Sequence, residues 1–295
     1  MDSNECNVIF KEKLLEMFYF LVNFFNENNI RYYACGGTAL GAIRHKGLIP
    51  WDDDIDLYVP REDYDRLSSL NDKLHEVGYN FVCFENNKDY YLPFGKIEDR
   101  NTSLQEYKDF KYITGVYVDI FPLDYYSGTK EDVALDQERY YKVFNKFQKS
   151  NSFISISDFL NLLVHAHIYS AWKWIKIYSH HPFKNMLYKN LMSEIEIARK
   201  RKGEWCVCMP QWRGKVFRTE WFENTIDVPF ENTYIKVPSA YDEYLSLLYG
   251  DYMTPPPPEK RILAHDDCRY YLNLKDGLTY EEIRKRLKKG EHTVI

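Results

Sequence analysis

The first part of the chain alternates between helix-period and strand-period patterns of apolar residues. Leu, Phe and Met recur at helical spacing over 8–28, and a second helical pattern over 61–78 ends at Gly78. A short helix is predicted at 39–45, with Thr38 as its N-cap. Runs rich in β-branched and aromatic residues predict strands at 30–35, 54–59, 79–84, 90–98 and 116–121. This alternation predicts an α+β fold, in which helices flank a mixed β-sheet.

The strand pattern stops near residue 130. Helical periodicity fills 130–202, and short strands return after it. We therefore expect three regions, which are 1–129, a helical region at 130–202 and a C-terminal region at 203–295.

Two further helices are predicted in the C-terminal region. The helix at 239–250 is expected to have Ser239 as N-cap and to stop at Gly250. The helix at 279–290 opens with a capping box of Thr279 and Glu282. Between them, four consecutive prolines predict a stiff, extended segment.

Composition narrows the class of protein. A net charge of −5 over 295 residues argues against general nucleic-acid binding, so we expect no nucleic-acid partner. The six cysteines show no paired C-x-x-C spacing, which favours free thiols over a zinc site. No signal peptide is visible at the N-terminus, and no apolar run reaches the ~18 residues of a membrane span. We expect a cytoplasmic protein.

The sequence WDDDID at 51–56 places four aspartates in five residues, just before an apolar run. In a strand, Asp54 and Asp56 would share one face at about 6.5–7 Å, where both stay charged only if a cation compensates them. One interpretation is a solvated acidic turn. A second is a calcium loop, which fails because Leu57 stands where an EF-hand needs glycine. A third is a Mg²⁺ or Mn²⁺ platform, since these ions prefer oxygen ligands.

Two neighbouring features favour the metal platform. Gly36 and Gly37 lie between a predicted strand and a predicted helix, where free backbone N–H groups can bind an anion. Asp119 lies within the apolar run VYVDIF, where an unpaired carboxylate would be costly unless it had a partner.

These residues resemble a known family. The block GGTALGAIRHKGLIPWDDDIDLYVPREDYDRL at 36–67 is similar to the signature of the LicD phosphotransferases, which include the fukutin-related proteins and belong to the polymerase-β-type nucleotidyltransferase superfamily. Similar segments follow in the same order at 94–104, 115–124, 228–231 and 249–265. The spacer between Gly37 and Asp54 is longer than in ordinary nucleotidyltransferases, as is typical of LicD-like chains.

The resemblance implies a nucleotidyltransferase-like catalytic core at 1–129 and a C-terminal region at 203–295 that closes the active site. It implies that Asp54, Asp56 and Asp119 are catalytic and hold Mg²⁺ or Mn²⁺, with Asp119 as either ligand or base. The phosphates of the donor would be bound by Gly36, Gly37, Thr38, Arg44, His45, Lys96, Arg100, Lys260, Arg261 and His265, with Trp51, Asp52 and Asp53 as possible helpers.

The implied reaction moves a phospho-alcohol, most often phosphocholine in this family, from a CDP-activated donor to a hydroxyl group and releases CMP. The acceptor would be a cell-surface glycan, a lipid-linked saccharide, or a precursor of lipopolysaccharide or teichoic acid. Ribitol phosphate or glycerol phosphate transfer and true nucleotidyl transfer remain alternatives. A non-catalytic ligand-binding protein of the same fold is the alternative of another class.

One segment suggests a further partner. The stretch 153–202 combines Trp172 and Trp174 with several lysines, including Lys173 and Lys176. Such a basic amphipathic surface can be explained by core packing with a solvated face, or by peripheral contact with anionic lipid at the inner face of the membrane.

Overall fold

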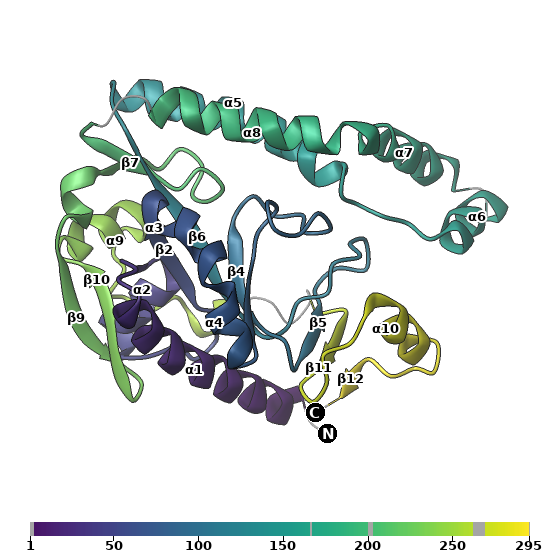
Figure 1. The fold of residues 1–295 in the computed structure, drawn as a ribbon, viewed down its shortest axis with the longest axis horizontal. Helices are drawn as coiled ribbons and strands as arrows, with labels where there is room; N and C mark the ends of the chain where they lie inside the picture. The colour runs from purple at the N-terminus through teal and green to yellow at the C-terminus, as the bar shows by residue number, and fades with distance from the viewer. Residues whose placement is uncertain (1–2, 166, 200–202, 262–268, 295) are drawn as a thin grey trace.

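The computed structural model describes residues 3–165, 167–199, 203–261 and 269–294. Helices and strands alternate through the first part of the chain, as the sequence predicts (Figure 1). The α-helices are α1 (Ser3–Glu27), α2 (Gly36–His45), α3 (Arg61–Leu67), α4 (Asn71–Glu76), α5 (Lys130–Lys149), α6 (Ile156–Val164), α7 (Ile168–Tyr178), α8 (Lys184–Arg199), α9 (Tyr241–Tyr249) and α10 (Tyr280–Leu287).

The main sheet has the strand order β1-β2-β6-β4-β3, and β7 and β8 extend it from β6. Strands β2 and β6 are parallel, and the other pairs are antiparallel, which confirms the predicted mixed sheet of an α+β fold. The strands are β1 (Tyr33–Ala34), β2 (Asp56–Pro60), β3 (Tyr79–Val82), β4 (Gly95–Asp99), β5 (Ser103–Gln105), β6 (Tyr117–Tyr126), β7 (Trp205–Val207), β8 (Phe217–Arg218), β9 (Thr225–Phe230), β10 (Thr233–Pro238), β11 (Tyr271–Asn273) and β12 (Thr293–Val294).

The first helix covers the main sheet because one of its faces is apolar. Its buried residues recur every three or four positions, which places them on one side of a 3.6-residue helix. They are Phe10, Leu14, Met17, Phe18, Leu21, Phe24 and Phe25. They join the buried residues of the central strands in one hydrophobic core, so the helix predicted at 8–28 is confirmed.

The helix after β1 begins earlier than predicted. It starts at Gly36, with Cys35 in the N-cap position, so Thr38 is not the N-cap. The Thr38 hydroxyl oxygen instead accepts a hydrogen bond from the backbone N–H of Asp56 at 2.8 Å. Thr38 therefore makes a tertiary contact in place of a helix cap, and this hydrogen bond joins the first turn of α2 to the start of β2.

The C-terminal caps are partly as predicted. Ala240 precedes α9, so Ser239 is not its N-cap, while Gly250 ends that helix with a φ of 71°. The capping box of Thr279 and Glu282 is confirmed in α10.

Several predicted element limits are wrong. The helix predicted over 61–78 is divided into α3, a 3₁₀ turn and α4, because serines follow α3 and the Ser69 hydroxyl donates to the Arg66 carbonyl. The strand predicted over 90–98 begins only at Gly95, after Pro93, which has no N–H to donate to a ladder.

The helical region forms a second layer. Helices α5 and α8 lie side by side along the top of the view in Figure 1, and α6 and α7 extend beyond their far end. A second core joins this layer to the sheet, through Tyr140 and Phe147 of α5, Leu191 of α8, Tyr126 at the end of β6 and Val207 of β7. The helices predicted within 130–202 are therefore confirmed.

The C-terminal region contributes to all three sheets. Strands β7 and β8 join the main sheet, β9 and β10 form a hairpin, and β11 pairs with β5 and β12. Strand β5 was not predicted, because three residues carry too short a pattern. In the residues described above, no helix combines the length and the apolar composition needed to span a bilayer.

A buried ion pair joins α3 to the end of the central strand. The Arg61 guanidinium donates to both carboxylate oxygens of Asp124, each at 2.9 Å. The side chains are 8% and 0% exposed. Such a pair tolerates the loss of neither partner, because the remaining charge would stay buried.

We expect Asp124→Asn to lower the free energy of unfolding by roughly 3 kcal/mol, because it leaves the Arg61 charge without a buried counter-ion. Denaturant unfolding measures this change. Asp65→Asn is the matched control, because Asp65 also faces Arg61, at 3.7 Å, but its side chain is 57% exposed. The control should cost less than about 1 kcal/mol, as surface pairs do. Equal costs for the two variants would contradict the assignment.

Candidate active site

Two carboxylates and an ammonium group lie in a row across the three central strands. Asp56 is paired with Asp119 in the parallel register of β2 and β6, and Lys96 is paired with Asp119 in the antiparallel register of β6 and β4. Backbone hydrogen bonds fix this register, because the Asp119 N–H donates to the Ile55 carbonyl at 2.9 Å and the Cys35 N–H donates to the Asp56 carbonyl at 3.1 Å. The sheet therefore brings together three residues that the sequence analysis selected.

Lys96 is the cation of this row. Its Nζ lies 2.9 Å from a carboxylate oxygen of Asp119 and 3.9 Å from one of Glu106. It also lies over the ring of Tyr117, 3.1 Å from the ring centre, and the Tyr117 hydroxyl donates to Glu106 at 2.6 Å. Lys96 thus binds a carboxylate network, whereas the sequence analysis assigned it to a phosphate.

The neighbouring carboxylates raise the pKa of Asp56. Burial raises the pKa of Asp56 well above its ordinary value, and the charges of Asp54, Asp119 and Asp52 raise it further. Lys96 opposes this shift. The edge of the sheet therefore carries more negative charge than its own cation compensates.

The aspartates of the acidic turn before β2 have two different kinds of contact. Asp52 and Asp54 precede the strand, which starts at Asp56, so the predicted strand alternation does not apply to them. Asp53 is buried and paired with Arg269, whose guanidinium also lies 3.9 Å from the ring centre of Phe10. Asp53 therefore anchors the turn, while Asp54 lines a narrow cavity that also contacts Glu106 and Tyr117.

The glycine pair allows other side chains to approach. A Cβ atom on Gly37 would lie 2.6 Å from a carboxylate oxygen of Asp52. Gly36 has a φ of 51°, and its N–H donates to the Tyr244 hydroxyl at 2.9 Å. The first amide of α2 is thus already engaged, and the glycines make room for the acids as well as supplying the helix N-terminus.

A basic and aromatic cluster forms beside the acidic turn. The Trp51 ring lies edge-on to His45, with the ring centres 5.8 Å apart, and the Arg261 guanidinium lies 5.2 Å from the Trp51 ring centre. Arg44 donates to the Tyr252 carbonyl at 2.8 Å. Burial lowers the pKa of His45, and the charges of Arg44 and Arg261 lower it further. The structure therefore groups four of the predicted donor-binding and helper residues.

Of the other three residues predicted to bind the donor phosphates, two are exposed and one is not described. Lys260 is exposed beside Arg261. Arg100 is exposed in the turn after β4, four residues beyond Lys96 and thus about 13 Å along the strand direction from the acidic row. His265 lies outside the described residues.

Two residues that the sequence analysis missed reach the acidic row from the turn after β7. The side-chain amide of Gln211 donates to Asp56 at 3.4 Å. The Trp212 ring packs against Gly36, and its indole nitrogen is buried without a hydrogen-bond partner in the described part of the chain. Both the indole nitrogen and a carboxylate oxygen of Asp56 lie within 4 Å of the point that a Cβ on Gly36 would occupy.

The helical layer holds this turn in place. The Gln137 side chain, fully buried in α5, donates to the Gln211 carbonyl at 3.3 Å and accepts from the Gly214 N–H at 2.6 Å. The Arg213 guanidinium binds both carboxylate oxygens of Glu138. Trp212 itself has a φ of 53°, which a bulky residue adopts only when its surroundings enforce it.

The donor set of the acidic row suits a hard divalent cation. Mg²⁺ usually binds one or two protein carboxylates together with phosphates of the substrate. Among the residues with described positions, no three carboxylate, imidazole or thiol groups form a ready ligand set. Asp54 and Asp56 are the residues that would hold such an ion, and Asp119 lies beside Asp56 with one of its two carboxylate oxygens on Lys96.

Comparison with known proteins agrees with this geometry. Residues 29–162 match the family model LicD/FKTN/FKRP, nucleotidyltransferase domain. This range contains Asp54, Asp56, Lys96 and Asp119 but excludes Gln211 and Trp212.

Two kinds of curated relative are similar to the chain. The lipopolysaccharide cholinephosphotransferase LicD of Haemophilus influenzae is 29% identical over 248 residues, which cover 82% of this chain and 89% of that protein. The ribitol 5-phosphate transferases FKRP of human and mouse are 39% identical over 57 residues, which cover 19% of this chain and 12% of theirs. Residues 29–162 thus carry the domain of the LicD family, and the similarity to a LicD protein extends far beyond them.

Proposed function

We propose that this protein transfers phosphocholine from CDP-choline to a hydroxyl group of a cell-surface glycan or of its lipid-linked precursor and releases CMP. The LicD family domain and the similarity to a cholinephosphotransferase support transfer of a phospho-alcohol. Similarity to a cholinephosphotransferase over most of both chains favours choline as the alcohol. The observation that carries the proposal is the row of Asp56, Asp119 and Lys96 inside the family domain.

The reaction assigns a task to each part of the site. The acceptor oxygen would attack the phosphorus that bears choline, and the bond from that phosphorus to the bridging oxygen would break, so that CMP leaves. The proton of the acceptor would pass to a carboxylate of the acidic row. A Mg²⁺ or Mn²⁺ ion held by Asp54 and Asp56 would supply charge stabilisation at the diphosphate.

The basic cluster suits the leaving group. His45 and Arg261 contact Trp51, next to the acidic turn, and Arg44 contacts His45. Guanidinium groups can bind the phosphate of CMP, and the Trp51 ring offers a stacking surface for a base or a choline cation. Ribitol phosphate is the second candidate, because the FKRP proteins match a part of this chain.

We expect Asp54→Asn, Asp56→Asn and Asp119→Asn each to lower kcat/KM by at least ~10²-fold, because each removes a carboxylate that would hold the cation or take the proton of the acceptor. CMP release from CDP-choline, CDP-ribitol and CDP-glycerol in the presence of Mg²⁺ measures the rate and identifies the donor. Asp227→Asn is the control, because Asp227 is exposed and pairs with Lys236 on the β9–β10 hairpin. Near-wild-type rates in the three site variants would contradict the proposal, and release of pyrophosphate from CTP would indicate a nucleotidyltransferase.

Asp56 also predicts how the metal-free protein responds to pH. Its pKa is raised in the folded state, so its contribution to stability is fully present below the unfolded pKa and is lost as pH rises through the folded pKa. At neutral pH, Asp56→Asn should therefore raise the melting temperature of the metal-free protein, by roughly 2–4 °C for each kcal/mol relieved.

Added Mg²⁺ or Mn²⁺ should raise the wild-type melting temperature at neutral pH and have little effect near about pH 5, where protons compete for the carboxylates. Asp56→Asn should lose this response, whereas Asp227→Asn should keep it. Thermal unfolding with and without the ion measures both effects. An equal response in wild type and Asp56→Asn would show that the ion binds elsewhere.

Trp212 gives a test of donor recognition. Its buried indole N–H has no partner in the described chain and lies next to the acidic row, so a donor phosphate or ribose oxygen is the acceptor that it fits. We expect Trp212→Phe, which keeps a ring but removes the N–H, to raise KM for the donor about tenfold and to change kcat less. Trp221→Phe is the matched control, because Trp221 is partly buried and packs on Phe217 at the edge of the hydrophobic core. A changed kcat with an unchanged KM would contradict this role.

A further inference from the structure

Helices α6 and α7 form an arm that carries an unusual concentration of exposed apolar side chains. Figure 1 shows the arm beyond the end of the α5–α8 layer. The described residues include 17 large apolar side chains that are exposed to solvent, and eight of them lie in this arm of 20 residues. An ordinary solvated surface does not concentrate exposed apolar side chains in this way. They are Ile156, Leu160, Leu163 and Val164 in α6, and Ile168, Tyr169, Trp172 and Ile175 in α7.

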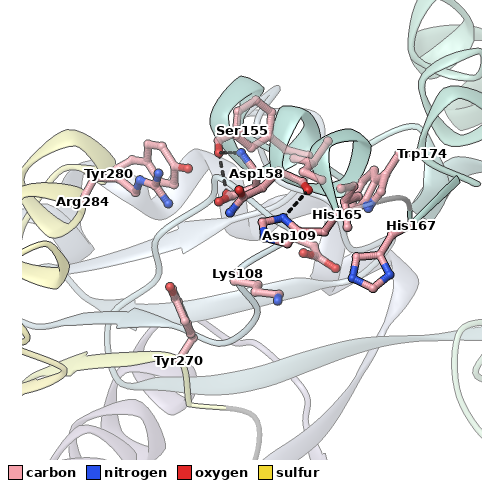
Figure 2. A pocket seen from close by; sticks show the side chains of 14 residues that line it. Lys108, Asp109, Ser155, Asp158, His165, His167, Trp174, Tyr270, Tyr280 and Arg284 are labelled. Atoms are coloured by element: carbon pink, nitrogen blue, oxygen red, sulfur yellow. Dashed lines mark hydrogen bonds between the residues drawn. The ribbon is translucent and has the colours of Figure 1, made fainter. Parts of the chain in front are cut away.

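The polar face of α6 is turned toward the protein. A cavity of about 550 Å³ lies between the arm and the C-terminal region, and Asp158, Asn161 and His165 line it (Figure 2). Lys108 lines the same cavity from the body of the protein, and Arg284 of α10 lines it from the C-terminal region. Successive helix residues are 100° apart, so these α6 side chains lie opposite Ile156, Leu160, Leu163 and Val164.

The α6–α7 arm thus exposes its apolar face to solvent and turns polar side chains toward the protein. A helix on a water-soluble domain normally buries its apolar face and exposes its polar face. Here Ile156, Val164 and Ile168 are 80%, 79% and 72% exposed. Exposing such a surface to water is unfavourable, so the arm is built for contact with an apolar partner.

The chemistry of the exposed face indicates which partner. Tyr169 and Trp172 stack with their ring centres 6.5 Å apart, and the Lys176 ammonium lies 5.5 Å from the Trp172 ring centre. Lys173 is exposed at the border of this face, toward Asp109 on the cavity side, and the acidic side chain of α6, Asp158, faces the cavity. Aliphatic side chains and interfacial aromatic rings on one face, with lysines on it and at its border, are the composition that binds an anionic membrane surface.

We propose that the α6–α7 arm lies on an anionic lipid bilayer, with its aliphatic side chains and Trp172 in the interface and its lysines at the headgroups. The arm then rests on the membrane through one face, while its other face lines the cavity in Figure 2. This inference does not depend on which donor the enzyme uses, because none of these residues belongs to the acidic row.

Flotation with vesicles tests the proposal. The full chain should float with vesicles made of equal parts phosphatidylcholine and phosphatidylglycerol, and much less with phosphatidylcholine alone. The triple variant Val164→Ser, Ile168→Ser, Trp172→Ser should reduce the partition coefficient at least about tenfold, because it removes apolar surface from the interface. Lys173→Gln with Lys176→Gln should reduce it several-fold, and added salt should do the same to the wild type.

The control variant removes the same kinds of side chain elsewhere. Leu135, Tyr234 and Met253 are 60%, 60% and 52% exposed and lie outside the arm, so their replacement by Ser should leave flotation unchanged. An unchanged melting curve and unchanged CMP release with a soluble acceptor would show that the arm variant is folded. The proposal would be overturned by three results: no flotation of the wild type, equal losses in the arm and control variants, or a lipid-free dimer that only the arm variant dissociates.

Discussion

The register between β2 and β6 determines the chemistry of this molecule. It places the carboxylate of Asp56 next to that of Asp119, and the adjoining register of β4 adds Lys96. A slip of one residue would turn every side chain of β2 to the other face, so the apolar residues Leu57 and Val59 fix the acids by being buried. Burial of the apolar residues thus supplies the free energy that keeps the like-charged carboxylates of Asp56 and Asp119 side by side.

The positions of the acids could be predicted from the sequence because they depend on local pattern. An apolar strand that carries a single Asp119, and an acidic turn that leads into another apolar strand, are recognisable without a structure. The partner of Asp119 could not be predicted, because Lys96 reaches it through antiparallel pairing between strands that are distant in sequence. The same holds for Arg269, which binds Asp53 across a separation of 216 positions in the sequence.

The predicted limits of helices failed where side chains form tertiary hydrogen bonds. Thr38 has the chemistry of an N-cap, but its hydroxyl is used by Asp56, and the helix extends past it to Gly36. Gln211 and Trp212 have no local signature at all. Their placement depends on Gln137, a glutamine in a helical region whose sequence indicates only a helix.

The helical layer therefore joins the two surfaces of the enzyme. At one end, α5 holds the turn that carries Gln211 and Trp212 against Asp56. Beyond its other end, α6 and α7 present their apolar face outward. The sequence of the arm predicts amphipathic helices, but amphipathicity alone does not say which face is turned inward, and folding rules would assign the apolar face to the core. That assignment fails for α6 because Asp158, Asn161 and His165 line the cavity together with Leu162, while Ile156, Leu160, Leu163 and Val164 are exposed. A layer that braces the acidic row through α5 and meets lipid through α6 and α7 would hold the site at a fixed height above a membrane, where a lipid-linked acceptor is confined to the same plane.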